Sequence, residues 1–245
     1  MMRNSFLFSA VMAFMLSCAP LPSIDDEPVN GGGNGNGVTE VYPLACYLFD
    51  GSADDMFGNY NGVLNGNPDF VTDTPDGSSG ALKLNAFKEQ FVNIPYDFFS
   101  GLEQYSFTAW IKDFSQGMIF SAEGENELPY LFVTDSQRFL LYNDYYSYTS
   151  QDKYTFAYDC TSIMSSDWHH LAVTSMKGEM ALYIDGKKYD SLSQPYDMTS
   201  CTKIYIGGNA DGRLANYMSM KIDNVMFFDY CLMSSEVDFI YKNRL

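Results

Sequence analysis

Two runs of sequence decide the fold of this chain. Residues Trp168–Thr174 have the sequence W-H-H-L-A-V-T, and residues Leu182–Lys187 have the sequence L-Y-I-D-G-K. Both are rich in aromatic, aliphatic and β-branched residues, which favour strands. An Asp-Gly pair tolerates the positive φ of a tight hairpin turn, so we expect two strands to pair across Asp185-Gly186.

Similar short runs, separated by turn residues, follow one another from Val41 onward. The expected strands are Tyr42–Phe49, Ala81–Leu84, Phe91–Ile94, Tyr105–Lys112, Gly117–Ser121, Tyr130–Thr134, Arg138–Tyr142, Tyr154–Tyr158, His169–Ser175, Met180–Ile184, Lys203–Gly207 and Met220–Phe228. Their near-regular spacing favours a β-sandwich or barrel. A serine cap and early acids in Ser234–Ile240 predict one short helix near the C-terminus.

The N-terminal segment has the pattern of an export signal. Arg3 precedes the apolar run Phe6–Leu16, and the residues M-L-S-C at 15–18 resemble the lipobox of bacterial lipoproteins. We therefore expect residues 1–17 to be a signal peptide and Cys18 to carry lipid. Ordinary cleavage after Ala19 is the alternative, which Pro20 at the cut disfavours.

Residues 18–40 are expected to form a lipidated, flexible tether that precedes one domain at residues 41–245. The segment Val29–Gly37, V-N-G-G-G-N-G-N-G, cannot bury apolar area. The acids Asp25, Asp26 and Glu27 resemble the export signal of surface lipoproteins in the Bacteroides group. The sequence therefore predicts a protein at the outer membrane and cell surface, attached to the membrane through its N-terminal lipid only.

The formal net charge of −17 excludes some partners. Such a surface repels nucleic acid and anionic lipid head groups, so we expect neither as a ligand. Solubility is the simpler reason for the charge. The residues give no indication of an oligomeric state.

Four cysteines remain once Cys18 is assigned to lipid: Cys46, Cys160, Cys201 and Cys231. An even number in an exported chain suggests two disulfides, with three possible connectivities. Four buried thiols are the alternative. None of the four lies in a C-x-x-C pair, so neither a zinc ribbon nor a thioredoxin-like site is indicated.

Several segments, in order, resemble the laminin-G-like, concanavalin A-like lectin/glucanase jelly roll of bacterial surface proteins. The matching segments are Tyr47–Gly51, Asp54–Gly62, Gly80–Leu82, Phe91–Pro95, Tyr105–Lys112, Trp168–Thr174, Leu182–Lys187, Ile222–Val225 and Leu232–Val237. This resemblance covers residues 41–245. It implies an all-β fold: a concanavalin A-like jelly-roll β-sandwich of two antiparallel sheets with a short C-terminal helix.

The resemblance also implies how parts of the chain pair. The first and last strands of this fold lie side by side, which implies a Cys46–Cys231 disulfide and leaves Cys160–Cys201 as the second. The two tryptophans, Trp110 and Trp168, fall at strand positions, where we expect large rings to fill the space between the sheets.

Catalysis is not expected. Glu123-Gly124-Glu125-Asn126-Glu127 imitates the Glu-x-Asp-x-Glu spacing of glucanases, but Gly and Asn occupy the alternating positions, so we interpret it as a solvated loop. The only histidines, His169 and His170, are adjacent on a strand and point to opposite faces, so we interpret both as structural.

A structural calcium ion is the predicted cofactor. Ca²⁺ takes six to eight oxygen ligands, and the first loop is rich in Asp and Asn. The resemblance implies that the last strand brings Asp223 beside the first. We therefore expect Asp50, Asp55 and Asp223 to be ligands, with solvated turn acids as the alternative.

Exposed tyrosines are the candidate ligand-binding residues. Six lie in the stretch Tyr142–Tyr158 among polar residues, and we favour Tyr145 and Tyr146 because they fall at an expected turn. Tyr rings can stack on sugar faces, although alternate tyrosines of a strand also pack in a core.

The function that the sequence favours is a non-catalytic, surface-displayed binding module for carbohydrate or glycoprotein. A structural or adhesive protein that binds another protein is the alternative, and a glycoside hydrolase is the third. The step from fold to function rests on analogy.

Overall fold

The computed structural model describes residues 41–124, 130–133, 138–142, 158–164, 167–176, 179–192, 201–209 and 216–245. Several predictions lie wholly or mostly outside these residues: the signal peptide and tether at residues 1–40, the lipid attachment at Cys18, the ligand-binding Tyr145 and Tyr146, the acidic segment 125–127 and the strand Tyr154–Tyr158 except for its last residue.

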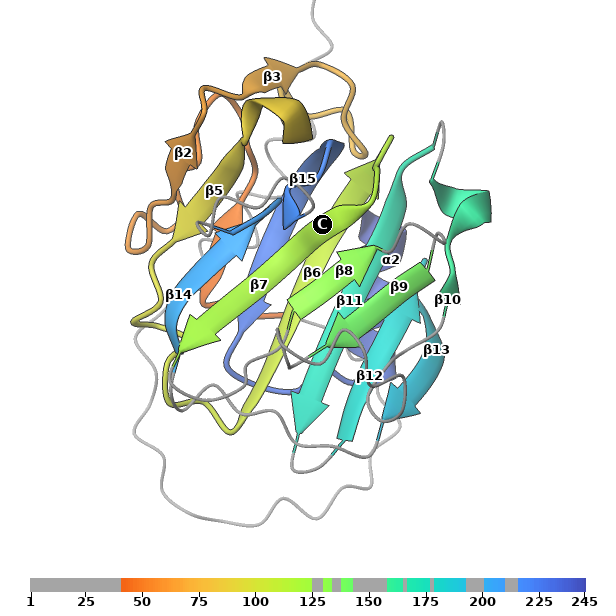
Figure 1. Ribbon diagram of the computed structural model, residues 1–245. Coiled ribbons are helices and arrows are strands. Elements are labelled where there is room, and N and C mark those ends of the chain that lie inside the picture. The colour runs from red at the N-terminus through yellow and green to blue at the C-terminus, as the bar shows by residue number, and fades with distance from the viewer. Residues whose placement is uncertain are drawn as a thin grey trace, which may run out of the picture. The chain divides into compact units, whose positions relative to one another are not determined.

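Two antiparallel sheets form a β-sandwich (Figure 1). The eight-stranded sheet contains β1 (Ala45–Tyr47), β3 (Asp69–Val71), β4 (Ala81–Leu84), β6 (Gln104–Lys112), β11 (His169–Met176), β12 (Glu179–Ile184), β13 (Lys187–Leu192) and β15 (Met220–Phe228). Its order is β13-β12-β11-β6-β15-β4-β3, and β1 also pairs with β15. The predicted all-β class is confirmed.

The second sheet has seven strands in the order β10-β9-β8-β7-β14-β5-β2. These are β2 (Val63–Asn65), β5 (Phe91–Ile94), β7 (Gly117–Gly124), β8 (Tyr130–Val133), β9 (Arg138–Tyr142), β10 (Tyr158–Asp159) and β14 (Cys201–Ile206). Two 3₁₀ turns, η1 (Ala86–Lys88) and η2 (Thr161–Ile163), and the helix α2 (Ser234–Asn243) complete the described elements.

The predicted hairpin is present and is one part of a three-strand meander. Strand β12 pairs with β11 on one side and with β13 on the other. Asp185 and Gly186 join β12 to β13 with φ angles of 48° and 75°, the left-handed backbone that was expected at this turn. Strands β2, β3 and β13 were not predicted, because the first two are only three residues long and the third is mostly polar.

The core lies between the sheets and is rich in aromatic rings. Along β6, Phe107, Ala109 and Ile111 are buried in it at alternate positions, as the pleat of a strand requires. Phe227 of β15 lies at its centre. Rings of five residues surround Phe227 with centroids 5.3–6.1 Å away: Tyr47, Phe98, Phe99, Phe107 and Phe120. Offset and edge-to-face contacts of this kind each add about 0.5–1.5 kcal/mol beyond area burial.

Helix α2 covers the outer face of the eight-stranded sheet. Val237 and Ile240 of the helix join a second apolar cluster with Phe228 and Met226 of β15. Trp110 also faces this side, so the prediction that it lies between the sheets is wrong. Its neighbours Ala109 and Ile111 take the inward positions, and its ring stacks on Tyr241 of α2 instead.

Trp168 is a second correction. It precedes β11 and is only partly buried, and its Nε1 donates a hydrogen bond to Asp73 Oδ1 at 3.2 Å. Asp73 also accepts hydrogen bonds from Lys112 and Lys221, which lie opposite each other on β6 and β15. The indole therefore belongs to a polar network at the surface rather than to the core.

The start of α2 differs from the predicted serine cap. Met233 is the N-cap residue, and its backbone N–H donates to the Glu236 side chain at 2.7 Å. Ser234 is already helical, and its hydroxyl lies 3.0 Å from Tyr183 Oη of β12. The early acid that was used to predict the helix therefore supplies the cap.

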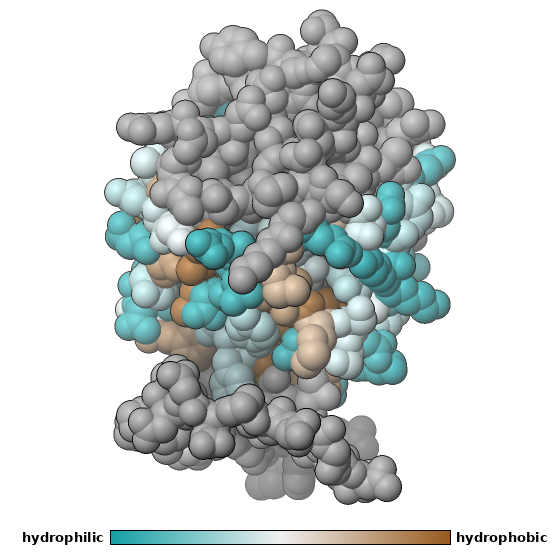
Figure 2. All heavy atoms as spheres, turned by 90° about the horizontal axis from the view of Figure 1, so that it is seen from below, coloured by the Kyte–Doolittle hydropathy of each residue, from teal (hydrophilic) through white to brown (hydrophobic). Residues whose placement is uncertain are grey.

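Polar residues dominate the described surface seen in Figure 2, with small apolar patches between them. Among the described residues, no helix is long and apolar enough to cross a bilayer.

Candidate functional site

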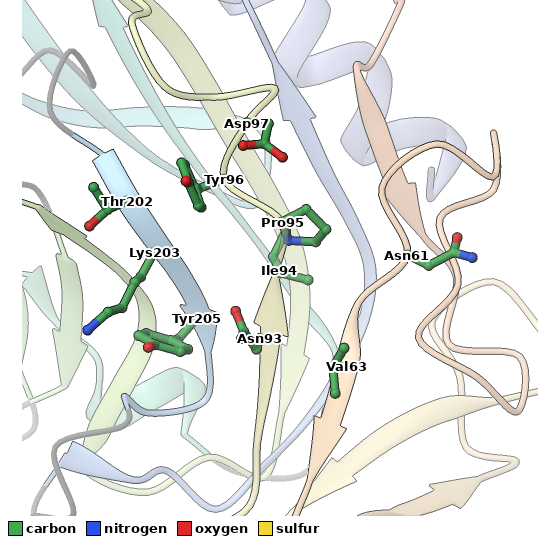
Figure 3. Close-up of a pocket in the computed structure, with 10 residues that line it drawn as sticks. All are labelled: Asn61, Val63, Asn93, Ile94, Pro95, Tyr96, Asp97, Thr202, Lys203 and Tyr205. Carbon is green, nitrogen blue, oxygen red and sulfur yellow. The ribbon is translucent and has the colours of Figure 1, made fainter.

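An open pocket of about 400 Å³ lies over β2, β5 and β14 of the seven-stranded sheet (Figure 3). Its volume is in the range of small-molecule sites. The lining residues are Asn61, Val63, Asn93, Ile94, Pro95, Tyr96, Asp97, Thr202, Lys203 and Tyr205. Most of them carry a polar group, and they come from three strands and the segments beside them.

The register of the strands sets the floor of the pocket. Asn93 of β5 lies opposite Val63 of β2 on one side and opposite Tyr205 of β14 on the other. Successive side chains of a strand point to opposite faces. Because Ile94 and Ile204 point into the core, their neighbours Asn93 and Tyr205 point outward (Figure 3).

Tyr96 supplies an exposed aromatic ring beside this floor. It follows β5, and 39 % of its surface is accessible to solvent. Its backbone carbonyl accepts hydrogen bonds from the N–H groups of Phe99 and Ser100, both at 2.9 Å, so the turn is fixed while the ring stays exposed. Asp97 beside it is also exposed.

Tyr205 forms a rigid part of the wall. Its ring meets the ring of Phe91 edge to face, with centroids 5.6 Å apart. Burial, together with the nearby carboxylate of Glu123, raises the pKa of Tyr205 to about 12. The phenol is therefore neutral at physiological pH and can donate as well as accept a hydrogen bond.

Lys203 is the only cation among the ten lining residues. It lies directly opposite Glu123 of β7, and its Nζ is 3.3 Å from Glu123 Oε2. The backbone carbonyl of Glu123 also accepts a hydrogen bond from the Thr202 hydroxyl at 3.2 Å.

Glu123 corrects one prediction. The segment that starts at Glu123 was interpreted as a loop, but β7 continues through Gly124. The strand persists because Glu123 and Gly124 pair with Lys203 and Cys201 of β14. The rest of the predicted loop, residues 125–127, lies outside the described residues.

The two histidines point to opposite faces, as expected. Nδ1 of His169 lies 2.9 Å from Asp185 Oδ2, so this ring holds the hairpin turn. His170 is fully buried beside the rings of Trp110 and Tyr241, and neither of its ring nitrogens has a hydrogen-bond partner. Burial lowers the pKa of His170 to about 3, so its ring is neutral at physiological pH.

Asp55, one of the predicted calcium ligands, organises the first loop instead. It is only 3 % exposed, and its two carboxylate oxygens accept three backbone N–H groups. The donors are Cys46 at 2.9 Å, Asn59 at 3.1 Å and Tyr60 at 3.3 Å. These donors account for its burial without a metal ion.

The other two predicted ligands are Asp50, whose Oδ1 accepts the backbone N–H of Gly80 at 2.7 Å, and Asp223. Asp223 lies on β15 and is fully buried, with Oδ1 accepting the backbone N–H of Asn224 at 2.9 Å. Its Oδ2 has no hydrogen-bond partner. Burial above all, with the charges of Asp76 and Asp50, raises the pKa of Asp223 to about 8.

This acidic cluster fits a hard cation only in part. An orphaned buried carboxylate oxygen beside two further acids is the donor chemistry that Ca²⁺ prefers. However, no three acidic, histidine or cysteine side chains in the described parts of the chain converge as a metal-binding group. A cation there would need backbone carbonyls or water for its remaining ligands. The calcium ion stays a prediction.

The four cysteines of the domain are thiols in this structure. Strand β1, which carries Cys46, pairs with β15, so the predicted neighbourhood of the first and last strands is confirmed. Burial raises the pKa of the Cys46 thiol to about 12, which makes it inert as a nucleophile at neutral pH. Both disulfides stay predictions.

The sequence did not predict the pocket residues, because the dense tyrosine run Tyr142–Tyr158 is the stronger aromatic pattern. Tyr96 is a single aromatic residue after Pro95, and only the turn that follows β5 exposes it. Lys203 and Asn93 are separated by more than a hundred residues, and the strand order alone brings them together. The pattern in the sequence that could have indicated this surface is the occurrence of polar residues at alternate positions of β5 and β14.

Comparisons with known proteins agree with this architecture. A family model of the Concanavalin A-like lectin/glucanases superfamily matches residues 76–238. A search of curated proteins finds no match.

Among solved structures, the chain is similar to domain 4 of AbnA, a GH43 extracellular arabinanase from Geobacillus stearothermophilus, in complex with arabinotriose. The TM-score is 0.61 at 19 % identity, over 81 % of this chain and 98 % of that domain.

It is also similar to the binding domain of botulinum neurotoxin DC, solved in complex with SialylT and with rat synaptotagmin II. Both comparisons have a TM-score of 0.63, at 17 % and 16 % identity over 82 % and 83 % of this chain. The chain spans about half of the neurotoxin binding domain, 51 % and 52 %. At such identities the likeness shows the fold alone.

Proposed function

The chain belongs to the Concanavalin A-like lectin/glucanases superfamily, and on this premise we propose that it binds carbohydrate, without catalysis, in the pocket over β2, β5 and β14. One observation carries the proposal: the exposed Tyr96 ring lies beside outward amide, hydroxyl and carboxylate groups on adjoining strands.

This combination suits a sugar for a physical reason. A pyranose or furanose ring has an apolar C–H face, which packs on an aromatic ring, and a rim of hydroxyls that donate and accept hydrogen bonds. Tyr96 offers the ring. Asn93, Asp97 and Tyr205 offer donors and acceptors on a rigid sheet, so little conformational entropy is lost on binding.

The lining also favours binding over hydrolysis. Glycoside hydrolysis uses a pair of carboxyl groups on either side of the scissile bond, about 5–10 Å apart. Among the ten lining residues, Asp97 is the single carboxylate. Glu123, which does not line the pocket, is paired with Lys203.

The solved relatives support binding as the common role of such domains. The arabinanase domain was solved with arabinotriose, and the neurotoxin domain with SialylT. A protein ligand is the second candidate for this chain, because the neurotoxin domain was also solved with rat synaptotagmin II. Val63, which is 60 % exposed at the pocket rim, would suit an apolar protein contact.

We also propose display at the cell surface, through lipid on Cys18 and the tether that follows it. The support is the lipobox-like pattern and the Gly/Asn composition of the tether. Labelling with radioactive palmitate, lost in Cys18→Ala, tests the lipid, and protease accessibility on intact cells tests the display.

A structural calcium ion is proposed at the acidic cluster, with Asp223, Asp50 and Asp76 as the side chains that would hold it. The support is the orphaned Asp223 Oδ2 beside two further acids. A bound cation would neutralise the buried carboxylate. Asp50 and Asp76 each use one oxygen to accept a backbone N–H, from Gly80 and Ser78. Asp55 is not part of this set, because both of its oxygens are used by three backbone N–H groups.

A glycan array with the purified protein tests the carbohydrate proposal. We expect binding to at least one glycan class, and a loss of about fivefold or more in Tyr96→Ala and Asn93→Ala, since each removes a contact worth about 1 kcal/mol or more. Phe87→Ala is the matched control, because Phe87 is 84 % exposed on η1 and does not line the pocket. Equal binding by all three variants would place the ligand elsewhere, and no binding to any glycan would refute the proposal.

A further inference from the structure

We infer that this pocket selects neutral glycans over glycans that carry carboxylate or sulfate groups, an inference that rests on the proposed function. It follows from the positions of three charged residues: Lys203 and Asp97 line the pocket, and Glu123 pairs with Lys203.

The cation of the pocket already has a partner. Lys203 and Glu123 are direct cross-strand neighbours on β14 and β7, and their side-chain charges lie 3.3 Å apart. An anionic sugar would need this ammonium group as its counterion, and it would have to compete with the carboxylate of Glu123.

Glu123 is held in that position by its own strand. Its backbone pairs with β14, and its carbonyl accepts the hydroxyl of Thr202 at 3.2 Å. These contacts fix the backbone of Glu123, so the carboxylate stays within side-chain reach of Lys203 when a ligand arrives. Glu123 does not line the pocket and would act through Lys203.

The remaining charge in the lining is negative. Asp97 is exposed at the end of the pocket near Tyr96 (Figure 3). Lys203, Glu123 and Asp97 together have a formal net charge of −1. An acidic sugar meets net repulsion here, whereas a neutral sugar can donate hydroxyl hydrogen bonds to Asp97.

The uncharged groups suit a neutral polyhydroxyl ligand. The amide of Asn93 can donate and accept hydrogen bonds, as can the phenol of Tyr205, while Asn61, whose oxygen accepts the Asp55 N–H at 3.1 Å, offers its amide N–H groups. Glu123 contributes to the raised pKa of Tyr205, which keeps this phenol protonated.

The net charge of the whole protein also disfavours the binding of anionic ligands. A formal net charge of −17 lowers the local concentration of anionic ligands, and salt screens this effect over a Debye length of about 10 Å at 0.1 M. The discrimination against acidic glycans should therefore weaken as the salt concentration rises, while binding of neutral glycans should not change.

The experiment compares two matched oligosaccharide series, one of neutral hexoses and one of the corresponding uronic acids, by calorimetry at low and high salt. The wild-type protein should bind the neutral series more tightly, by about threefold to tenfold at low salt. Glu123→Gln leaves Lys203 without its partner and should raise the affinity for the uronic acids by about threefold, the scale of an exposed ion pair.

Glu179→Gln is the matched control. It removes the same charge from another exposed lysine–glutamate pair, Lys188–Glu179 on the eight-stranded sheet, whose charges lie 2.9 Å apart. It should leave uronic-acid binding unchanged, and unaltered thermal unfolding of both variants verifies the fold. Equal gains in the two variants, or tighter binding of uronic acids by the wild type, would overturn the inference alone. Failure to bind either series would overturn the proposed function as well.

Discussion

Trp110 of β6 stacks on Tyr241 of α2, with ring centroids 5.7 Å apart and ring planes inclined by 21°. The indole Nε1 also donates a hydrogen bond to the Leu245 carbonyl at 2.9 Å. One side chain thus attaches the helix and the residues after it to the outer face of the eight-stranded sheet.

Trp110→Ala should therefore destabilise the protein strongly. Loss of a buried tryptophan costs about 3–5 kcal/mol, because both its apolar area and its contacts disappear. Urea unfolding measures the change. Trp168→Ala is the comparison, and it should cost about 1 kcal/mol or less since that ring is partly exposed. Similar losses in the two variants would contradict the role given to Trp110.

Asp55→Ala should weaken the first loop. The substitution leaves three backbone N–H groups without their acceptor, and each buried, unsatisfied donor costs about 1–3 kcal/mol. Partial hydration should reduce the sum, so we expect about 2–4 kcal/mol in the free energy of unfolding. Asp54→Ala, at an exposed neighbour, should stay within about 0.5 kcal/mol of wild type. If both variants matched wild type, Asp55 would not organise the loop.

His170 should make the protein sensitive to acid. Its pKa is about 3 in the folded protein and about 6.5 when exposed, so between these values only the unfolded chain binds the proton. Stability is fully present above pH 6.5 and falls toward pH 3, by at most about 1.4 kcal/mol per pH unit. His170→Phe should flatten this part of the curve, measured by urea unfolding from pH 7 to pH 4. Parallel curves for wild type and variant would show that His170 does not contribute.

In the absence of divalent cations, Asp223 should make the protein less stable as the pH rises, which is opposite to the effect of His170. Its folded pKa of about 8 exceeds its value of about 3.9 in an unfolded chain, so the folded protein retains the proton over this range. The stability contributed by the protonated acid is present below pH 3.9 and is lost as the pH rises toward 8. Asp223→Asn should remove this loss, so the variant should gain on wild type as the pH rises in a chelating buffer.

The same variant tests the calcium proposal. A bound cation stabilises the ionised carboxylate, so at pH 8 calcium should raise the melting temperature of the wild type, with a rise that grows with the logarithm of the calcium concentration once this exceeds Kd. It should leave Asp223→Asn unchanged. Asp55→Asn provides the control, because Asp55 lies outside the proposed set and this variant should still respond. Identical melting of the wild type in calcium and in chelator would end the proposal.

The strands and the fold class followed from the sequence because they depend on local composition. Phe91–Ile94, Arg138–Tyr142 and Met220–Phe228 were predicted with the observed bounds, since each is a run of strand-forming residues between turns. Strand β13 was missed because its stability comes from pairing with β12 and not from its own residues.

The site was far less predictable. Trp110 was assigned to the core because its size favours burial, but burial under a helix satisfies the same preference. Asp55 was predicted to be a calcium ligand because acidic residues in a loop can bind a cation. In the structure, three backbone N–H groups donate hydrogen bonds to its carboxylate. The pocket depends on strand order, which places Asn93 beside Tyr205, and no local pattern encodes that juxtaposition.

The pairing of β1 with β15 has a consequence for the order in which the protein can fold. Ala45 of β1 pairs with Phe227 of β15, and most of the domain lies between them in the sequence. Long-range pairings of this kind slow folding, because loop-closure entropy is lost before the contact forms. During synthesis the eight-stranded sheet cannot be completed, and β1 stays without its partner, until β15 has emerged from the ribosome. Premature termination before β15 should therefore yield an insoluble product rather than a smaller folded one.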